Sequence, residues 1–307
     1  MKSFSVLKSN VGSFIQDTSS GTGTLIGHWV NNRYRDIVNS YDWEQLYHTQ
    51  MLTATANTSA YPLDENTERV VFVHDKSNDS YTDIITEQEY LQGYYDVWDT
   101  IGRPEACFLK GEAVRSQPAS GTQILVTSSS ASDITQTVLV RGITSTQNEI
   151  YESLTLTGTT PATATNSYSQ ILGLSKSDVT VGKVKVYEND GTTLLAEMSP
   201  ENLVSRYKIL NFHPIPDSET IYAIRSKRVV LPLSQDYDYP IIEDIDDIIE
   251  AGAQADAWKY KRQFSKATAL ETQYQILKTE RIHREVAQPG IIHTFTPTPL
   301  DRDDGIL

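Results

Sequence analysis

Few residues in this 307-residue chain have the types and spacing that chemistry requires. The six histidines never stand at the short spacing of metal ligands, and a single cysteine offers neither a thiolate cluster nor an intrachain disulfide. The sequence therefore predicts no metal site, and a buried, reduced thiol at Cys107. The histidines are His28, His48, His74, His213, His283 and His293.

Motifs for covalent catalysis and for nucleotide binding are also missing from the sequence. It contains no Gly-x-Ser-x-Gly turn, and the glycines of "SSGTGTLIG" follow no strand and precede no lysine at the spacing of a phosphate loop. We therefore expect neither catalytic residues nor a cofactor, and no enzyme. A hydrolase stays open only because any two of the 40 acidic residues could meet in a cleft. Activity on host polysaccharide would distinguish it.

The acidic run "DYDYPIIEDIDDIIE" from Asp236 to Glu250 has oxygens that suit a hard cation. It lacks the alternating Asp or Asn residues and the central glycine of a calcium loop. Carboxylates are favoured in the first turn of a helix, so we interpret the run as a helix start with a solvated face. The four tryptophans are interpreted as core residues rather than as a sugar platform, since three lie in or beside helical stretches.

Charge and hydropathy restrict the partners and the compartment. The chain has 26 basic and 40 acidic residues and a net charge of -14, with a pI near 4.8. Such a chain is expected to repel nucleic acid rather than to hold it by releasing counterions. We find no signal peptide in residues 1–20 and no apolar run long enough for a membrane span. The length favours two folded units.

Two helical patterns supply the elements that would position functional residues. After a flexible leader at residues 1–24, one helix is predicted from Leu25 to Trp43 and another pattern over 241–286, with a break near 263–265. Apolar residues recur on one stripe of the first helix, and we expect that stripe to pack on the second pattern. Asn31, Arg35 and Asp36 are expected to face a neighbour or solvent. The predicted packing residues are Ile26, Trp29, Val30, Ile37, Tyr41, Trp43, Ile245, Ile249 and Ala253.

Strands are predicted on both sides of a serine- and threonine-rich stretch. A small antiparallel sheet is expected to combine strands near Val70 and Cys107 with strands at 207–212 and 220–225. Between them, residues 117–204 alternate apolar with polar residues in short runs, separated by turn signals such as Asn189-Asp190-Gly191. This pattern predicts an inserted β-sandwich. Thr86 and Glu89 are spaced as a capping box that begins a short helix.

The predicted fold class is therefore α+β, with a helical core, a small antiparallel sheet, an inserted all-β sandwich and an extended C-terminal arm. The expected domains are the leader at 1–24, a discontinuous core at 25–116 and 205–286, the insert at 117–204 and the arm at 287–307. The arm is rich in proline and has apolar residues without periodicity. We expect it to become ordered on another protein.

The order of several motifs resembles one known family. "HWVNNRYRDIVNSYDWEQL", "YPLDENTERVVFVHD", "IGRPEACFL" and "ILNFHPIPDSETIYAIRSK" follow one another in the chain, and a Gly-Ala-rich helix comes last. This layout resembles the head-to-tail adaptor (connector) proteins of tailed bacteriophages, in particular the larger podophage type. The resemblance covers about 25–116 and 205–280. No single motif is specific, because each alone is only a packing or turn signal.

The resemblance implies a structural virion protein at the capsid-tail junction, assembled in the host cytoplasm. It implies a homo-oligomeric ring, dodecameric in that family, that binds the portal protein and a tail nozzle or tail tube protein. DNA would pass through the channel without specific binding, and tail fibres are a further expected partner of the insert. The arm would dock on the portal through Ile291, Ile292, Phe295 and Leu300. The alternative is a carbohydrate-binding tail or receptor-recognition module that uses the sandwich.

Overall fold

The computed structural model describes residues 1–17, 19–93, 99–119 and 121–286. They form two compact units, one of helices and one made mostly of strands. Among the described residues, the helical unit contains 1–2, 6–41 and 243–286, and the strand-rich unit contains 3–5 and 42–242. The predicted α+β class is confirmed. The boundary differs from the expected one, because the helices form a unit apart from the sheet. The predicted arm at 287–307 lies outside the described residues.

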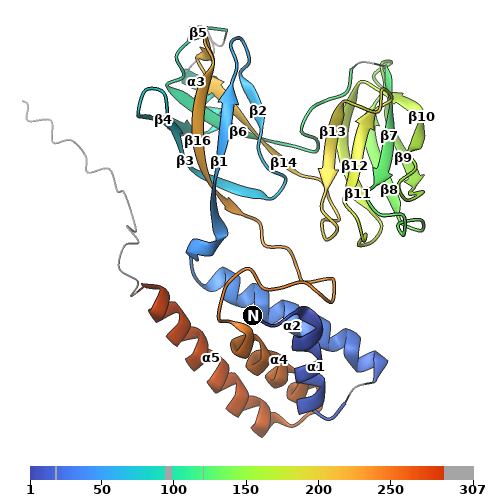
Figure 1. Ribbon diagram of the computed structural model, residues 1–307, viewed down its shortest axis with the longest axis vertical. Coiled ribbons are helices and arrows are strands. Elements are labelled where there is room, and N and C mark those ends of the chain that lie inside the picture. Colours follow the sequence, from blue (N-terminus) through green and yellow to red (C-terminus); the bar gives the residue numbers. More distant parts are fainter. Residues whose placement is uncertain (18, 94–98, 120, 287–307) are drawn as a thin grey trace, which may run out of the picture. The chain divides into compact units, whose positions relative to one another are not determined.

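The helical unit consists of α1 (Phe4–Phe14), α2 (Ser20–Ser40), α4 (Asp246–Tyr260) and α5 (Phe264–Val286). In Figure 1, α4 and α5 run side by side as a hairpin, and α2 packs against α4. The break predicted between the last two helices is confirmed at residues 261–263, where Arg262 adopts a left-handed φ of 57°. Sequence periodicity thus predicted α2, α4 and α5 but not α1.

The expectation of a flexible leader at residues 1–24 is wrong. Leu7, Val11 and Ile15 recur every four residues, and all three are buried along α1 and just beyond its end. Lys2 at the start of the chain forms ion pairs with Asp247 and Glu250 of α4, at 2.8 and 3.0 Å. The first turns of the chain are therefore anchored to the helical unit.

The helix α2 begins at Ser20 rather than at the expected Leu25. Asp17 accepts hydrogen bonds from the backbone and the hydroxyl of Ser19, at 3.2 and 2.9 Å, and from the Thr22 hydroxyl at 3.1 Å. A carboxylate near the N-terminus of a helix also complements the helix dipole. These bonds stabilise the additional turn despite Gly21 and Gly23.

The main sheet of the strand-rich unit has the strand order β1-β16-β3-β4-β6-β14-β2. The strands predicted near Val70 and Cys107 and those at 207–212 and 220–225 lie in it, as expected. The sheet is mixed rather than antiparallel, because β4 and β6 are parallel neighbours. The strands are β1 (Tyr47–Ala54), β2 (Ala60–Pro62), β3 (Thr67–Asp75), β4 (Ser80–Ile85), β6 (Ala106–Glu112), β14 (Tyr207–His213) and β16 (Thr220–Arg228).

Parallel neighbours require a crossover connection, and α3 (Glu87–Gly93) lies in that connection. The predicted capping box is present at its start. The Thr86 backbone and hydroxyl donate to the Glu89 carboxylate at 2.7 and 2.8 Å, and the Glu89 backbone donates to the Thr86 hydroxyl at 3.1 Å. Three short elements complete this part of the unit: η1 (Glu44–Leu46), β5 (Ile101–Gly102) and β15 (Ile215–Pro216).

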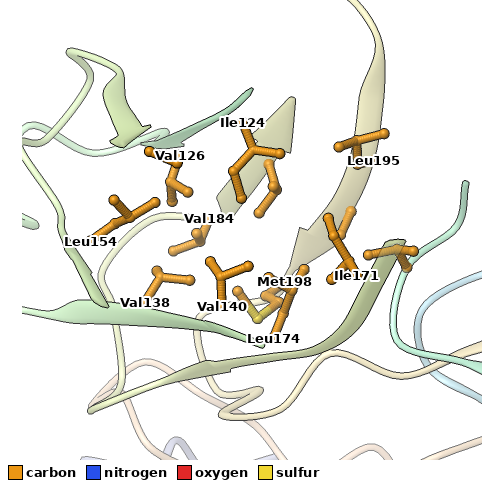
Figure 2. Packing of buried hydrophobic residues seen from close by; sticks show 14 of the residues in the cluster. Ile124, Val126, Val138, Val140, Leu154, Ile171, Leu174, Val184, Leu195 and Met198 are labelled. Atoms are coloured by element: carbon orange, nitrogen blue, oxygen red, sulfur yellow. The ribbon is translucent and has the colours of Figure 1, made fainter. Parts of the chain in front are cut away.

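The insert is a sandwich of a four-stranded sheet, ordered β10-β7-β12-β13, and a three-stranded sheet, ordered β11-β8-β9. Figure 2 shows side chains from both sheets, such as Val126 and Val140, meeting in one core. Tyr207 and Ile209 of β14 belong to the same core. The strands are β7 (Thr122–Ser128), β8 (Thr137–Ile143), β9 (Glu149–Thr155), β10 (Ala162–Tyr168), β11 (Gln170–Lys176), β12 (Val184–Glu188) and β13 (Leu194–Met198).

The sandwich replaces the turn of a hairpin in the main sheet. β6 leads into it and β14 leaves it, and these strands pair antiparallel from Glu112↔Tyr207 to Ala106↔His213. The Tyr207 hydroxyl donates to the Glu197 carbonyl at 2.8 Å and accepts from the Glu197 backbone at 2.7 Å. The two ends of the insert are thereby fixed beside each other.

Candidate functional site

The residues predicted to pack the helices lie mostly in the interior of the helical unit. Ile26, Val30 and Ile37 of α2 are buried, while Trp29 and Tyr41 are only half-buried. The Trp29 ring contacts the ring of Tyr260 on α4, with centroids 5.7 Å apart. On the partner side, the buried predicted residues are Ile245, Ile249 and Ala253.

Trp43 does not belong to the helix, contrary to the predicted helix bounds. It is fully buried, but it lies beyond α2 and precedes η1, in the strand-rich unit. The backbone leaves the helix because Tyr41, the residue after Ser40, is extended, with φ -154° and ψ 162°. Trp43 therefore belongs to a different unit from the α2 stripe.

An ion-pair network around Arg33 connects three helices of the helical unit. The guanidinium donates to both carboxylate oxygens of Asp256 on α4, at 2.7 and 2.6 Å, and to both of Glu271 on α5, at 3.0 and 2.7 Å. It also lies over the Tyr274 ring, 4.7 Å from the centroid. Such two-point contacts fix both distance and orientation. The network therefore fixes how α2, α4 and α5 pack together.

The charges in this network are strongly stabilised by one another. Burial disfavours the Arg33 cation, but the hydrogen bonds to Asp256 and Glu271 outweigh that cost and raise its pKa. The hydrogen bond from Arg33 holds the pKa of Glu271 at about 2. All three side chains are mostly buried. Because every charge has an opposite partner, the network acts as a structural lock rather than as an acid-base site.

Asp36 is exposed to solvent, as expected, and its carboxylate also contacts α5. It accepts hydrogen bonds from the Tyr274 hydroxyl and, at 2.9 Å, from the Lys278 ammonium group. Gly252 leaves space for the Arg33 and Tyr274 side chains. A Cβ at this position would lie 2.7 Å from Cδ of Arg33 and 2.9 Å from Cδ2 of Tyr274. Arg35 is exposed, and Asn31 is half-buried.

One group of side chains has the composition of a catalytic triad but not its geometry. His48 Nε2 lies 3.3 Å from the Ser226 hydroxyl and 3.3 Å from the Asp64 carboxylate. In a triad the serine and the carboxylate contact different ring nitrogens, whereas here both contact Nε2 and the buried Nδ1 has no hydrogen-bond partner among the described residues. Ser226 is also fully buried. This group cannot present a nucleophile to a substrate.

The other titratable groups singled out in the sequence are structural in character. Cys107 is fully buried in the main sheet, and burial raises its pKa to about 12, so the thiolate is scarce at neutral pH. Burial lowers the pKa of His213. Within the described ranges, no three His, Cys, Asp or Glu side chains gather as a cation site, and no helix has the length and apolar character for a membrane span.

An open groove of about 480 Å³ lies in the strand-rich unit. Its lining includes Glu65, Thr67, Val204 and Lys208. Glu65 is already saturated, since it accepts from the Ser199 backbone at 2.8 Å and from the Asn202 amide. The groove is therefore a shallow surface feature rather than an enclosed substrate pocket.

The four arm residues predicted to dock on a portal, Ile291, Ile292, Phe295 and Leu300, lie outside the described residues. No protein-family model matches the sequence, and no curated protein matches it either.

Proposed function

We propose that the protein is a head-to-tail adaptor of a tailed bacteriophage, a structural virion protein that joins the portal vertex to the tail. The supporting observation is that the two segments that resemble this family, about 25–116 and 205–280, contribute to both units. In the helical unit α2 packs on α4, and in the strand-rich unit β6 pairs with β14. The sandwich is an addition to that framework.

The electrostatics agree with a channel wall. A chain with a net charge of -14 repels phosphates, so DNA would slide through a ring of such subunits without being held. The proposed partners are the portal protein, a tail nozzle or tail tube protein, and further copies of the chain in a dodecameric ring. The insert offers a surface for tail fibres. The site of action is the capsid-tail junction, after assembly in the host cytoplasm.

Deletion of residues 289–307 tests the proposal. The apolar side chains in this segment are the proposed portal anchors, so the truncated chain should fail to co-sediment with purified portal rings. A full-length variant with Asp303→Asn and Asp304→Asn, which keeps those anchors, is the matched control and should co-sediment. Unchanged co-sedimentation of the truncated chain would refute portal docking by the arm.

Electron microscopy of labelled particles tests the location directly. A label attached at Leu307 should appear at the capsid-tail joint of negatively stained virions. A label at the fibre tips would instead support the carbohydrate-binding or receptor-recognition alternative. The sandwich favours that alternative in one respect: Tyr151 is largely exposed beside the Arg141–Glu149 ion pair, as in a sugar-stacking site. The full chain on a glycan array, compared with Tyr151→Ala, would detect such binding.

A further inference from the structure

The turn between α4 and α5 carries a basic and aromatic surface on an otherwise acidic chain. Residues 258–266, "WKYKRQFSK", contain four cations and three aromatic residues and no acid. Tyr260 and Phe264 are 62% and 65% exposed. We call Trp258, Tyr260, Arg262, Phe264 and Lys266 the turn surface. Exposed aromatic rings beside cations are typical of a surface that a partner covers.

Contacts within the turn surface hold it in shape. The Lys266 ammonium lies 4.4 Å from the Trp258 ring centroid, as a cation-π contact. The Lys261 ammonium donates to the carbonyl of Ile15, the residue after α1, at 2.9 Å. This hydrogen bond ties the turn to the end of α1. The surface is thus preorganised rather than a loose loop.

Two cations of the turn surface are available to a partner. Lys259 is engaged by Glu271 at 2.9 Å, and Lys261 by Asp17 at 3.6 Å. Arg262 and Lys266 are exposed, and within the ranges that the structure describes neither has a carboxylate within ion-pair distance. A partner surface with free carboxylates would complement them.

The complementary charges stand at the other end of α4. Glu243 and Asp244 are exposed and precede the helix, and their carboxylates have no cation within ion-pair distance among the described residues. We call these two residues the acidic end. The 15 residues of α4 separate the acidic end from the turn surface by about 22 Å, so the two cannot meet along this helix. Exposed Tyr237 and Tyr239 come shortly before in the chain.

We propose that the turn surface of one copy binds the acidic end of the next copy, in a head-to-tail contact. A contact between two different surfaces of the same chain repeats from copy to copy and closes into a ring when the rotation permits. It also offsets, at one place, the repulsion between chains that each carry a net charge of -14. This inference names the copy-to-copy contact of the proposed ring and rests on that proposal.

Cross-linking of the full chain tests the contact. Ser265→Cys and Ile241→Cys variants, whose exposed uncharged positions lie beside the turn surface and the acidic end, are mixed and treated with a short bismaleimide; buried Cys107 does not compete. We expect mixed dimers in about tenfold excess over a mixture of Ser265→Cys with Ser145→Cys, whose new thiol lies in an exposed turn of the sandwich. Mixed dimers no more abundant than in that control would overturn the proposal. The tenfold figure corresponds to ~1.4 kcal/mol of association.

Charge reversal provides a second measurement. Arg262→Glu with Lys266→Glu should weaken self-association by roughly tenfold or more in sedimentation velocity, most clearly at low salt. Mixing that variant with a chain that carries Glu243→Lys and Asp244→Lys should restore association, now between the two variants. If the reversal instead removes binding to a DNA oligonucleotide and leaves self-association unchanged, the turn surface binds nucleic acid and the proposal is wrong.

The two proposals fail separately. A label at the capsid-tail joint without the cross-link refutes the copy-to-copy contact and leaves the adaptor function standing. A cross-link without a label at the joint refutes the adaptor function and leaves the copy-to-copy contact standing.

Discussion

Replacing Arg33 by methionine should destabilise the helical unit, because it leaves two carboxylates facing each other. Among the described residues, Asp256 and Glu271 would keep Lys259 alone as a cation partner. Removing one partner of a buried ion pair costs about 3–5 kcal/mol. Since the two carboxylates retain some exposure to water, we expect a loss of about 2–4 kcal/mol in the free energy of unfolding at pH 7.

The pH dependence gives this prediction a second magnitude. Pairing lowers the pKa of Glu271 from its ordinary 4.5 to about 2, and one pKa unit corresponds to about 1.4 kcal/mol. A carboxylate with a lowered pKa stabilises the fold fully above pH 4.5, and that contribution of about 3 kcal/mol is lost as the pH falls from 4.5 toward 2. In Arg33→Met this loss between pH 4.5 and 2 should largely disappear.

Urea unfolding followed by circular dichroism at 222 nm, from pH 2.5 to 7, measures both effects. Arg35→Met, at an exposed position two residues along the same helix, is the matched control and should stay within about 0.5 kcal/mol of the parent. Adding Glu271→Gln to Arg33→Met should recover part of the stability, because it removes an uncompensated charge. If Arg33→Met keeps the stability of the parent and its pH profile, then Arg33 does not hold the three helices together and the reasoning is refuted.

Three further predictions concern single sites. Gly252→Ala should cost about 1–3 kcal/mol in urea unfolding, because its Cβ would press on Arg33 and Tyr274; an unchanged midpoint would contradict the close approach. Burial lowers the pKa of Lys176 to about 8, so the unfolded chain binds more protons between pH 8 and 10.5 and stability should rise over that range. Lys176→Met should abolish the rise, and a parent protein without it would refute the prediction. Cys107 should react with iodoacetamide at pH 8 only after unfolding, and rapid labelling of the native chain would disprove its burial.

Periodicity predicted those parts of the fold that local patterns specify. The α2 stripe and the α4 face from Ile245 to Ala253 repeat at helical spacing, and the sandwich strands alternate at the spacing of two. The helix α1 was missed because a short helix that contains serine and glycine owes its stability to tertiary packing rather than to propensity. Within the insert, β10 gives little sequence signal, because "ATATNSY" contains only one large apolar residue, Tyr168.

The Arg33 network could not be predicted because its members are far apart in the sequence. Arg33 lies more than 200 residues before Asp256 and Glu271, and nothing in the charge pattern of one helix names its partners on another. A glycine in the middle of a helical pattern, Gly252, was the one local signal that side chains approach closely there. The exposed turn surface was likewise concealed by the overall acidity of the chain.

The placement of the sandwich within a hairpin also affects the order of folding. β6 and β14 pair across roughly 100 intervening residues, and closing so long a loop is slow and entropically costly for an unfolded chain. A sandwich that folds first brings its two ends together and reduces that search to the formation of a local hairpin. Tyr207 links the two steps, since it packs in the sandwich core and also pairs with β6 within the main sheet. During synthesis the insert would then template the sheet that carries it, so weakening the sandwich core should slow completion of the main sheet.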